Sequence, residues 1–471
     1  MGRVAGALAQ RANELIQAVE SQQRTDPVET ITAELFPLCD ALRWISRRGP
    51  RVLADRRVGW RDRPLWLVGI SSRVVRDPLG RVLILGAWNY PLFLPGVQAA
   101  QALAAGNQVL LKPAPGAELA TQLMVDCFYD EGIAKQDLKC LPSDVSAAQQ
   151  AIQSGVDLVV LTGSATTGRK VLGATAPTLT PSIVELSGCD GVIVLPGFDP
   201  DRLISAIQFG LNLNSGATCI GPRRLIPALP LDELKTLRWQ LRQQLTASTT
   251  HTVHPSAVPP VIAAIESARD DGLRPLTLPQ DASPADSVAA LNEVIGGLRE
   301  RSEKKPLILD DVAANASIAS SDLFAPILSI VPVSDQQEAI DAVNQCQYRL
   351  AASVFGRNDD CQRVASQLAI GCVTINDLIA ATADPRLPFG GRGESGFGVT
   401  RGPEGLLAMT HPKVVITRRG RLAPHLSPRN DGDENLLRGA LEFQHGATLR
   451  QRFDGLLQMV SRKRDSTNDP G

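Results

Sequence analysis

The sequence has few histidines and no closely spaced cysteine pairs, and these absences exclude several kinds of site. Only five histidines occur in 471 residues, and none lies beside a candidate nucleophile along the chain. The eight cysteines are scattered, and none forms a Cys-x-x-Cys pair. This spacing indicates neither a zinc site nor a disulfide framework. We therefore expect no metal and a reduced, cytoplasmic protein.

A net charge of one sign and a long apolar run are also lacking. The formal charge is -1, which gives no reason to expect a nucleic acid or an anionic membrane as partner. No apolar run approaches the roughly 18 residues that span a bilayer, so we expect no integral membrane segment. Residues 1–33 lack an apolar signal core, which argues against export. The chain exceeds the roughly 250–300 residues that one hydrophobic core serves, and two sizeable domains are expected.

Strands and helices alternate over residues 81–186 in a pattern that predicts a parallel sheet. The expected strands are 82–85, 108–112, 157–161 and 183–186, and the expected helices are 96–105, 118–129 and 167–173. The run Val82-Leu83-Ile84-Leu85 is apolar throughout, which is typical of a strand covered on both faces. A second alternating region follows Gly191, with strands expected at 192–195, 306–309, 328–333, 352–355 and 373–375. The chain is therefore predicted to have an α/β fold.

The two ends of the chain show other patterns. Residues 1–50 carry apolar side chains at helical spacing and predict a covering helix. Residues 51–79 predict loops and short strands, and residues 414–417 predict a late strand. Residues 423–436 are polar and rich in Pro, Asn and Asp, as in a linker, and a single charged helix is expected over 435–461.

Several chemically useful residues lie where predicted strands end. Trp88-Asn89, Lys112 and Glu185 are at or near such ends, and parallel sheets bind ligands at the carboxyl ends of their strands. The segment from Gly163-Ser164 to Gly168 follows a strand and opens a helix, where backbone N–H groups can hold a pyrophosphate. Taken alone, this turn is a common structural one, and Lys112 is equally consistent with an exposed surface lysine.

Three side chains are candidates for the chemistry itself. Cys219 lies among small and polar residues at 214–222 and is a candidate nucleophile, although free cysteine is often a small core residue. Glu185 is either a structurally paired acid or a base with a raised pKa. Asn89 either donates to an oxyanion or caps a turn. The Gly-x-Gly-x-x-Gly match at 391–396 follows a Pro-rich loop rather than a strand, so it is not interpreted as a dinucleotide fingerprint.

Seven short motifs, taken in order from about Ser71 to Arg419, resemble those of the aldehyde dehydrogenase superfamily. They are Ala87-Trp88-Asn89-Tyr90-Pro91, the stretch from Ala102 to Asn107 running to Leu111-Lys112-Pro113, Leu161-Thr162-Gly163-Ser164, Val184-Glu185-Leu186-Ser187-Gly188, Asn214-Ser215-Gly216-Ala217-Thr218-Cys219, Asp322-Leu323-Phe324-Ala325-Pro326, and Pro388-Phe389-Gly390-Gly391 with Ser395-Gly396. Their order and the 34-residue separation of Glu185 and Cys219 (219 − 185) make the resemblance specific. The N-terminal part and the run to Met409-Thr410-His411 most resemble the class-three, fatty-aldehyde branch.

The resemblance implies NAD(P)-dependent oxidation of a small-molecule aldehyde to a carboxylic acid. Cys219 is then the nucleophile, Glu185 the general base and Asn89 the oxyanion donor. The residues that it places at NAD or NADP are Trp88, Lys112, Gly163, Ser164, Gly168, Asp322 and Phe324. A homodimer or homotetramer is also implied.

The same resemblance implies a division into domains. A Rossmann-like cofactor domain is expected over 1–188 with the return of 385–411, and a catalytic domain over 189–384. Part of 60–80 and the strand 412–422 are expected to form an oligomerisation arm. A linker with a C-terminal helix and tail is expected over 423–471.

Some residues depart from the family pattern. Ser187 and Ala217 stand where glycine and glutamine are common, Asp322 is one methylene shorter than the usual glutamate, and Ala325 replaces glycine. Pro115 stands where an acid often follows the lysine, so NAD and NADP both stay open. Two alternatives remain: an acyl-transferring, CoA-acylating relative, and a non-enzymatic scaffold with weakened cofactor binding.

Overall fold

The computed structural model describes residues 1–67, 69–246, 250–279, 281–419 and 423–465. Its chain divides into two compact units. The larger unit comprises residues 1–56 and 74–413, and the smaller comprises 57–73 and 414–471. Each is described by itself.

One lobe of the larger unit is built on a six-stranded sheet of order β19-β7-β6-β3-β4-β5. Its strands are β3 (Arg81–Leu85), β4 (Gln108–Lys112), β5 (Leu138–Cys140), β6 (Leu158–Gly163), β7 (Ser182–Leu186) and β19 (Gly396–Phe397). All pairs are parallel except β19 with β7. The intervening helices are α5 (Phe93–Ala104), α6 (Glu118–Asp130), α7 (Val145–Gln153) and α8 (Ala165–Thr175). The predicted parallel sheet is confirmed.

The other lobe contains a seven-stranded sheet of order β11-β13-β14-β9-β8-β16-β17. Its strands are β8 (Asp190–Val194), β9 (Pro222–Pro227), β11 (Arg274–Pro275), β13 (Leu307–Asp310), β14 (Ile327–Ile330), β16 (Ala351–Phe355) and β17 (Cys372–Ile375). Only β11 pairs in the antiparallel sense. The accompanying helices are α9 (Pro200–Asn212), α10 (Leu231–Thr246), α11 (Val258–Asp270), α12 (Pro284–Arg301), α13 (Gln336–Asn344) and α14 (Asn358–Ala365). The α/β class is thereby confirmed.

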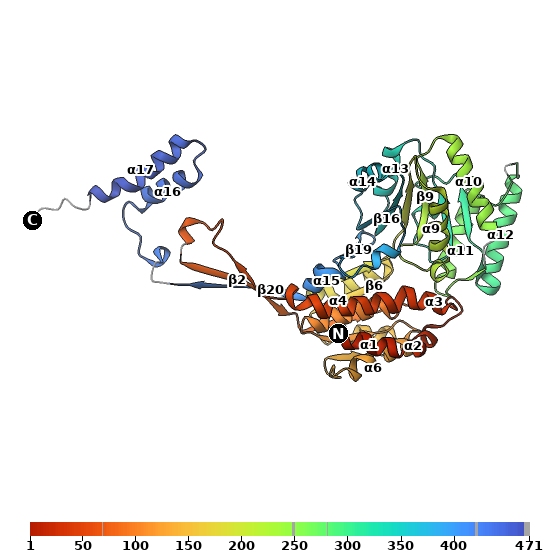
Figure 1. Cartoon of the computed structure of the whole chain (residues 1–471), viewed down its shortest axis with the longest axis horizontal. Coiled ribbons are helices and arrows are strands. Elements are labelled where there is room, and N and C mark those ends of the chain that lie inside the picture. Colours follow the sequence, from red (N-terminus) through yellow and green to blue (C-terminus); the bar gives the residue numbers. More distant parts are fainter. Residues whose placement is uncertain (68, 247–249, 280, 420–422, 466–471) are drawn as a thin grey trace, which may run out of the picture. The chain divides into compact units, whose positions relative to one another are not determined.

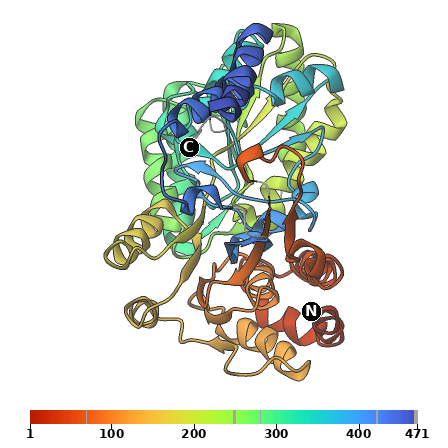
Figure 2. The same cartoon turned by 90° about the vertical axis from the view of Figure 1, so that its left-hand side faces the viewer.

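The N-terminal residues form a helical layer on the first sheet. Its helices are α1 (Gly2–Gln10), α2 (Ala12–Val19), α3 (Pro27–Thr30) and α4 (Phe36–Val52), with a π-helical turn (Ile31–Leu35) before α4. Leu8, Leu15 and Leu42 are fully buried and share a hydrophobic core with Val82 and Ile84 of β3. These helices lie beside β6 in Figure 1, and Figure 2 shows the two lobes from another side. The predicted covering role is confirmed, by several helices rather than one.

The smaller unit contains arm strands and a helical hairpin. Strand β20 (Thr410–Arg418) pairs in a three-stranded sheet with β2 (Ile70–Pro78) and β1 (Arg56–Val58). These strands begin or end in the larger unit. At 69–71 and 417–419 the strands are joined by hydrogen bonds from Arg419 N to Gly69 O (2.7 Å) and from Ser71 Oγ to Thr417 O (3.4 Å).

The prediction of one helix over 435–461 is wrong. The chain forms α16 (Asp433–His445) and α17 (Leu449–Asp465), which turn back on each other after Gly446. Glycines allow the close approach, because a Cβ at Gly455 would lie 2.6 Å from the carbonyl oxygen of Gly439. The predicted linker also ends earlier than expected, since α16 begins at Asp433. The end of the predicted tail, residues 466–471, lies outside the described residues.

Candidate active site

A cavity of about 970 Å³ lies in the larger unit at the carboxyl ends of the strands of the first sheet. All of the predicted site residues except one border it, although they come from six separate stretches of chain. They are Trp88, Asn89, Lys112, Gly163, Ser164, Glu185, Cys219, Asp322 and Phe324. The residues that the sequence places at the carboxyl ends of the strands therefore border one cavity in the structure.

Gly168 is the exception, because it does not border this cavity. It lies inside α8, where an added Cβ would meet the Cδ1 atom of Leu186 at 2.9 Å. The glycine lets α8 pack closely on β7, which is a structural role rather than a direct contact with a ligand.

The wall formed by β6 and α8 is suited to an anion. Strand β6 ends at Gly163, and Ser164 caps α8 by accepting a hydrogen bond of 3.2 Å from Thr167 N. The N-terminus of this 11-residue helix thus borders the cavity, where its backbone N–H groups and its dipole favour an anion. Lys112, Arg169 and Lys170 also border the cavity, and sequence reasoning missed the last two because surface cations on a helix carry no local signal.

The lining of the cavity also includes an acid and aromatic rings. Asp322 Oδ1 is buried and has no hydrogen-bond partner among the described residues. Burial raises the pKa of Asp322 to about 6, against the opposing effects of the Ser187 hydroxyl and Arg223. Trp88 stacks on His254 with ring centroids 4.0 Å apart, and its ring lies 5.8 Å from that of Phe324. His254 was not predicted, since it lies 166 residues from Trp88 (254 − 88).

Cys219 is held in a conformationally unusual loop between α9 and β9. Asn214, Ser215 and Gly216 have φ of 51°, 53° and 77°, which are left-handed values. A Cβ at Gly216 would lie 2.5 Å from the carbonyl carbon of Ala325, so only glycine fits there. Arg223 is buried in β9 and its Nη2 donates to the carbonyl oxygens of Gly216 (2.8 Å) and Thr218 (3.1 Å).

The connection between β7 and β8 packs on the same loop. A Cβ at Gly188 would lie 2.7 Å from the carbonyl oxygen of Cys219. Gly188 is three residues from Glu185, which lies one residue before the end of β7 and is only 3% exposed. The two lobes of the larger unit therefore bring the acid and the thiol to the same cavity.

Burial raises the pKa of both Glu185 and Cys219. For Cys219, the negative charges of Glu185 and Asp190 raise it further, and Arg401 opposes this effect. For Glu185, Arg401 and the hydroxyl of Thr400 lower the pKa against burial. The thiol is therefore protonated at neutral pH and needs a base to remove its proton. The raised pKa of Glu185 makes its carboxylate a stronger base than an exposed carboxylate is.

Arg401 is a buried cation that sequence reasoning missed. Its guanidinium carbon lies 4.1 Å from the ring centroid of Phe389 and 5.5 Å from that of Phe93. Its Nη1 donates to the carbonyl oxygen of Thr382 at 2.7 Å. A single arginine after a glycine-rich loop has no pattern that marks it as buried beside an acid.

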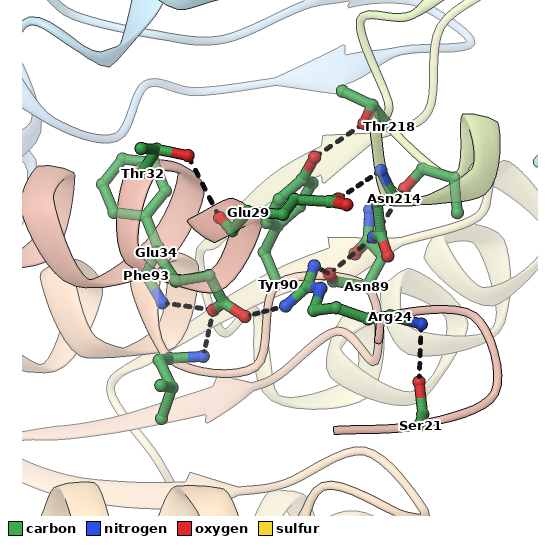
Figure 3. A network of polar contacts seen from close by, with 12 residues as sticks. Ser21, Arg24, Glu29, Thr32, Glu34, Asn89, Tyr90, Phe93, Asn214 and Thr218 are labelled. Carbon is green, nitrogen blue, oxygen red and sulfur yellow. Dashed lines mark hydrogen bonds and ion pairs between the residues drawn. The ribbon is translucent and has the colours of Figure 1, made fainter. Parts of the chain in front are cut away.

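Asn89 is anchored at both its side chain and its backbone. Its Nδ2 donates to the carbonyl oxygen of Ala217 at 3.0 Å, and an amide NH₂ has a second N–H available for a ligand. Its carbonyl oxygen accepts from Arg24 Nη2 (2.5 Å) and Asn214 Nδ2 (2.8 Å), as Figure 3 shows. Sequence reasoning did not include Arg24 or Asn214 in the site.

The model of the aldehyde dehydrogenase family matches residues 1–415. The chain belongs to the aldehyde dehydrogenase family. It is 30% identical to 4,4'-diapolycopene aldehyde oxidase of Methylomonas sp, an alignment that covers 89% of this chain and 77% of the relative. It is 27% identical to aldehyde dehydrogenase family 3 member A2 of Mus musculus, covering 87% and 81%. The predicted relation to the class-three branch is confirmed.

Solved structures show the same relationship. The structure of a Mycobacterium tuberculosis aldehyde dehydrogenase complexed with NAD⁺ matches with a TM-score of 0.76 and 25% identity, covering 89% of this chain and 85% of that one. A structure from Burkholderia cenocepacia, described as a putative aldehyde dehydrogenase, matches with a TM-score of 0.79 at 22% identity, covering 90% and 86%, and so supports the fold.

This aldehyde dehydrogenase is an oxidoreductase that acts on the aldehyde group with NAD or NADP. The predictions of family, activity and cofactor class are thereby confirmed. The described part of the chain contains no group of three or more His, Cys, Asp and Glu side chains that could hold a metal ion. None of its helices, over the residues described, has the length and apolar character needed to cross a membrane.

Proposed function

We propose that Cys219, Glu185 and Asn89 carry out the oxidation of an aldehyde to a carboxylic acid. The observation that supports this assignment is that all three border the cavity whose walls also present the α8 N-terminus and Asp322. Sulfur is strongly nucleophilic once deprotonated. The Cys219 thiol and the Glu185 carboxyl, whose pKa values are both raised, lie at this one cavity. A pair of this kind allows the proton to move from Cys219 to Glu185.

The first half of the reaction uses the thiolate and the oxyanion donors. The sulfur attacks the aldehyde carbon and forms a thiohemiacetal whose oxygen is stabilised by Asn89 Nδ2–H and the backbone N–H of Cys219. A bound nicotinamide cofactor would supply the hydride acceptor, and Cys219 then carries the acyl group as a thioester. Removing one oxyanion donor, as in Asn89→Ala, is expected to lower kcat by roughly 10²–10³-fold.

The second half uses Glu185 as a general base. Once the proton taken from Cys219 has passed to solvent, the Glu185 carboxylate takes a proton from water, the resulting hydroxide attacks the thioester carbon, and the C–S bond breaks, with the proton on Glu185 returning to the sulfur. The carboxylic acid leaves and the thiol is regenerated. Thr400 holds the carboxylate in place through its hydrogen bond to Oε2, and the buried Oε1, unpaired within the described residues, is available for water.

The residues present fit a nicotinamide dinucleotide. The N-terminus of α8 with Ser164 would hold the pyrophosphate, and Lys112 a ribose hydroxyl. The unpaired Oδ1 of Asp322 would accept from the other ribose, and Trp88 and Phe324 would pack on the ligand.

The deciding experiment is NAD(P)H formation from a panel of aldehydes, with NAD and NADP tested separately. The panel includes long apolar aldehydes, because one relative is described as a diapolycopene aldehyde oxidase. Cys219→Ser should abolish product while leaving cofactor binding, measured by calorimetry, intact. A thioester formed only with added CoA would indicate an acyl-transferring enzyme, and a protein that binds neither cofactor would indicate a scaffold.

We also propose that the first lobe, with 385–411, binds the cofactor and that 189–384 supplies the nucleophile.

We propose a cytoplasmic homodimer or homotetramer, in which residues 60–80 and 412–422 serve as the oligomerisation arm. The unpaired state of all eight cysteines supports a reducing compartment. Exposed apolar side chains on the hairpin, such as Leu441 (63%) and Phe453 (59%), support a subunit contact. Light scattering of the full chain and of Leu441→Lys tests the assembly.

A further inference from the structure

The segment over residues 21–35, between α2 and α4, lies against the residues that surround Cys219. Figure 3 shows Arg24, Glu29 and Glu34 of this segment around Asn89 and Asn214, which lie next to each other. It is buried at two charged positions, Arg24 (4% exposed) and Glu34 (0%). Burial of two charges is costly unless they are paired and hydrogen-bonded, and their contacts show what they hold in place.

Arg24 and Glu34 together fix the chain from Asn89 to Phe93. They form an ion pair with each other, and Arg24 Nη2 donates to Asn89 O at 2.5 Å. The second carboxylate oxygen of Glu34 accepts from Leu92 N (2.7 Å) and Phe93 N (3.0 Å), the first turn of α5. The backbone of Asn89 and the helix that follows it are therefore held by one buried ion pair.

The same segment also holds the left-handed residues that precede Cys219. Glu29 accepts a hydrogen bond from the backbone N–H of Asn214. Ser215 Oγ donates to the carbonyl oxygen of Gln23 at 2.9 Å. Non-glycine residues in this conformation are strained and persist only where their surroundings enforce it. The segment thus contacts both the oxyanion donor and the nucleophile loop.

We infer that Arg24, held by Glu34, is a positioning residue that sets the Asn89 amide relative to Cys219. The inference rests on the proposed role of Asn89. The Asn89 side chain reaches Ala217 O, two residues before the thiol, while Arg24 and Asn214 anchor its carbonyl oxygen. Displacement of a reacting group by about 1 Å can lower the rate by about 10²-fold. Loss of the Arg24 contact should therefore lower the rate measurably.

The variants are chosen so that the protein folds. Arg24→Lys keeps the charge beside Glu34 but loses the fork that bridges Glu34 and Asn89. The double variant Arg24→Gln with Glu34→Gln removes both charges, and the amide oxygen still accepts from Leu92 N and Phe93 N. Arg11→Gln is the control. Arg11 lies in the same N-terminal layer, away from the cavity, and pairs with Glu14 and with Asp130 of α6.

The test is a double-mutant cycle on kcat/KM for the aldehyde. We expect Arg24→Lys to lower kcat/KM roughly tenfold and the double variant up to about a hundredfold. Cofactor affinity by calorimetry should stay within about twofold in both. In the Asn89→Ala background the Arg24→Lys change should cost less than about twofold, because the group it positions is already gone. Equal costs in the two backgrounds would overturn the inference.

A second measurement does not depend on turnover. Amide hydrogen exchange in Arg24→Lys should become faster in peptides covering 88–94 and 213–219 and stay unchanged elsewhere, whereas Arg11→Gln should change neither peptide. Unchanged exchange in both peptides contradicts the inference even if the enzyme is active. If Asn89→Ala has wild-type turnover, the proposed role of Asn89 fails instead, and accelerated exchange then shows Arg24 to be a purely structural anchor.

Discussion

Thr400 Oγ1 donates a hydrogen bond of 3.0 Å to Glu185 Oε2, although 215 residues separate the two along the chain. The contact forms because β19, which pairs with β7 at Glu185, is followed closely by Thr400. Arg401 follows and lowers the pKa of Glu185 by its charge. Thr400 and Arg401 therefore both favour ionisation of the proposed base in its buried site.

Thr400→Val tests the hydrogen bond to Glu185. Loss of the donor removes an effect that lowers the pKa of Glu185, so the base stays protonated to higher pH. The acidic limb of the pH profile of kcat is expected to move to higher pH, with KM for the cofactor unchanged. Thr236→Val is the control, since the Thr236 hydroxyl donates to Asp232 O within α10. An unmoved acidic limb would remove Thr400 from this role.

Arg401→Met removes the neighbouring positive charge. The pKa of Glu185 should rise for this reason too, so activity should fall more at pH 6 than at pH 8. Folding should also weaken, by about 1–3 kcal/mol, because the buried carbonyl of Thr382 loses its donor. Arg401→Lys keeps the charge and should restore much of the pH profile. Equal losses at both pH values would show that the charge has no effect on the base.

Gly216→Ala tests the left-handed loop before Cys219. A Cβ there would meet the Ala325 backbone at 2.5 Å, and φ is 77°. Strain and overpacking together should lower the free energy of unfolding by about 2–5 kcal/mol. Gly6→Ala in α1 is the control. The new Cβ would meet no neighbouring described atom within 4 Å, and the free energy of unfolding should rise by about 0.5–1 kcal/mol. Urea unfolding of both variants measures the difference, and similar midpoints would contradict the strain.

Asp322→Asn should change stability and cofactor binding in opposite directions. The folded-state pKa of about 6 lies above the ordinary value of 3.8, so the folded protein binds more protons and loses stability as pH rises between these values. The variant should therefore gain about 1–3 kcal/mol over wild type at pH 7 and little at pH 4. It should bind cofactor more weakly. A variant less stable than wild type at pH 7 would contradict the raised pKa.

Much of the fold was predictable because its signals are local. Apolar runs such as Val82–Leu85 become buried parallel strands, and Gly106 and Pro113 end the elements near them. The hairpin of α16 and α17 was missed because both halves are helical by pattern. Only the packing of Gly439 on Gly455 shows that the chain turns back.

The candidate site divides in the same way. Cys219, Glu185, Asn89 and the Gly163-Ser164 turn were predicted from short motifs whose residue types match their chemistry. Gly168 matched the same turn by pattern, yet the structure assigns it to packing against Leu186. Periodicity cannot distinguish a glycine that faces a ligand from one that faces a neighbouring strand.

The sequence by itself determined the α/β class and the family, and it indicated the thiol, acid and amide that we propose for the chemistry. Tertiary structure alone decided which charges surround them. Arg24, Thr400 and Arg401 come from segments far from Glu185 and Cys219 in sequence, and nothing in their local pattern marks them as buried. The reason is physical: a residue's chemistry is local to the chain, whereas pKa values and donor positions depend on every group that folding brings within a few ångströms.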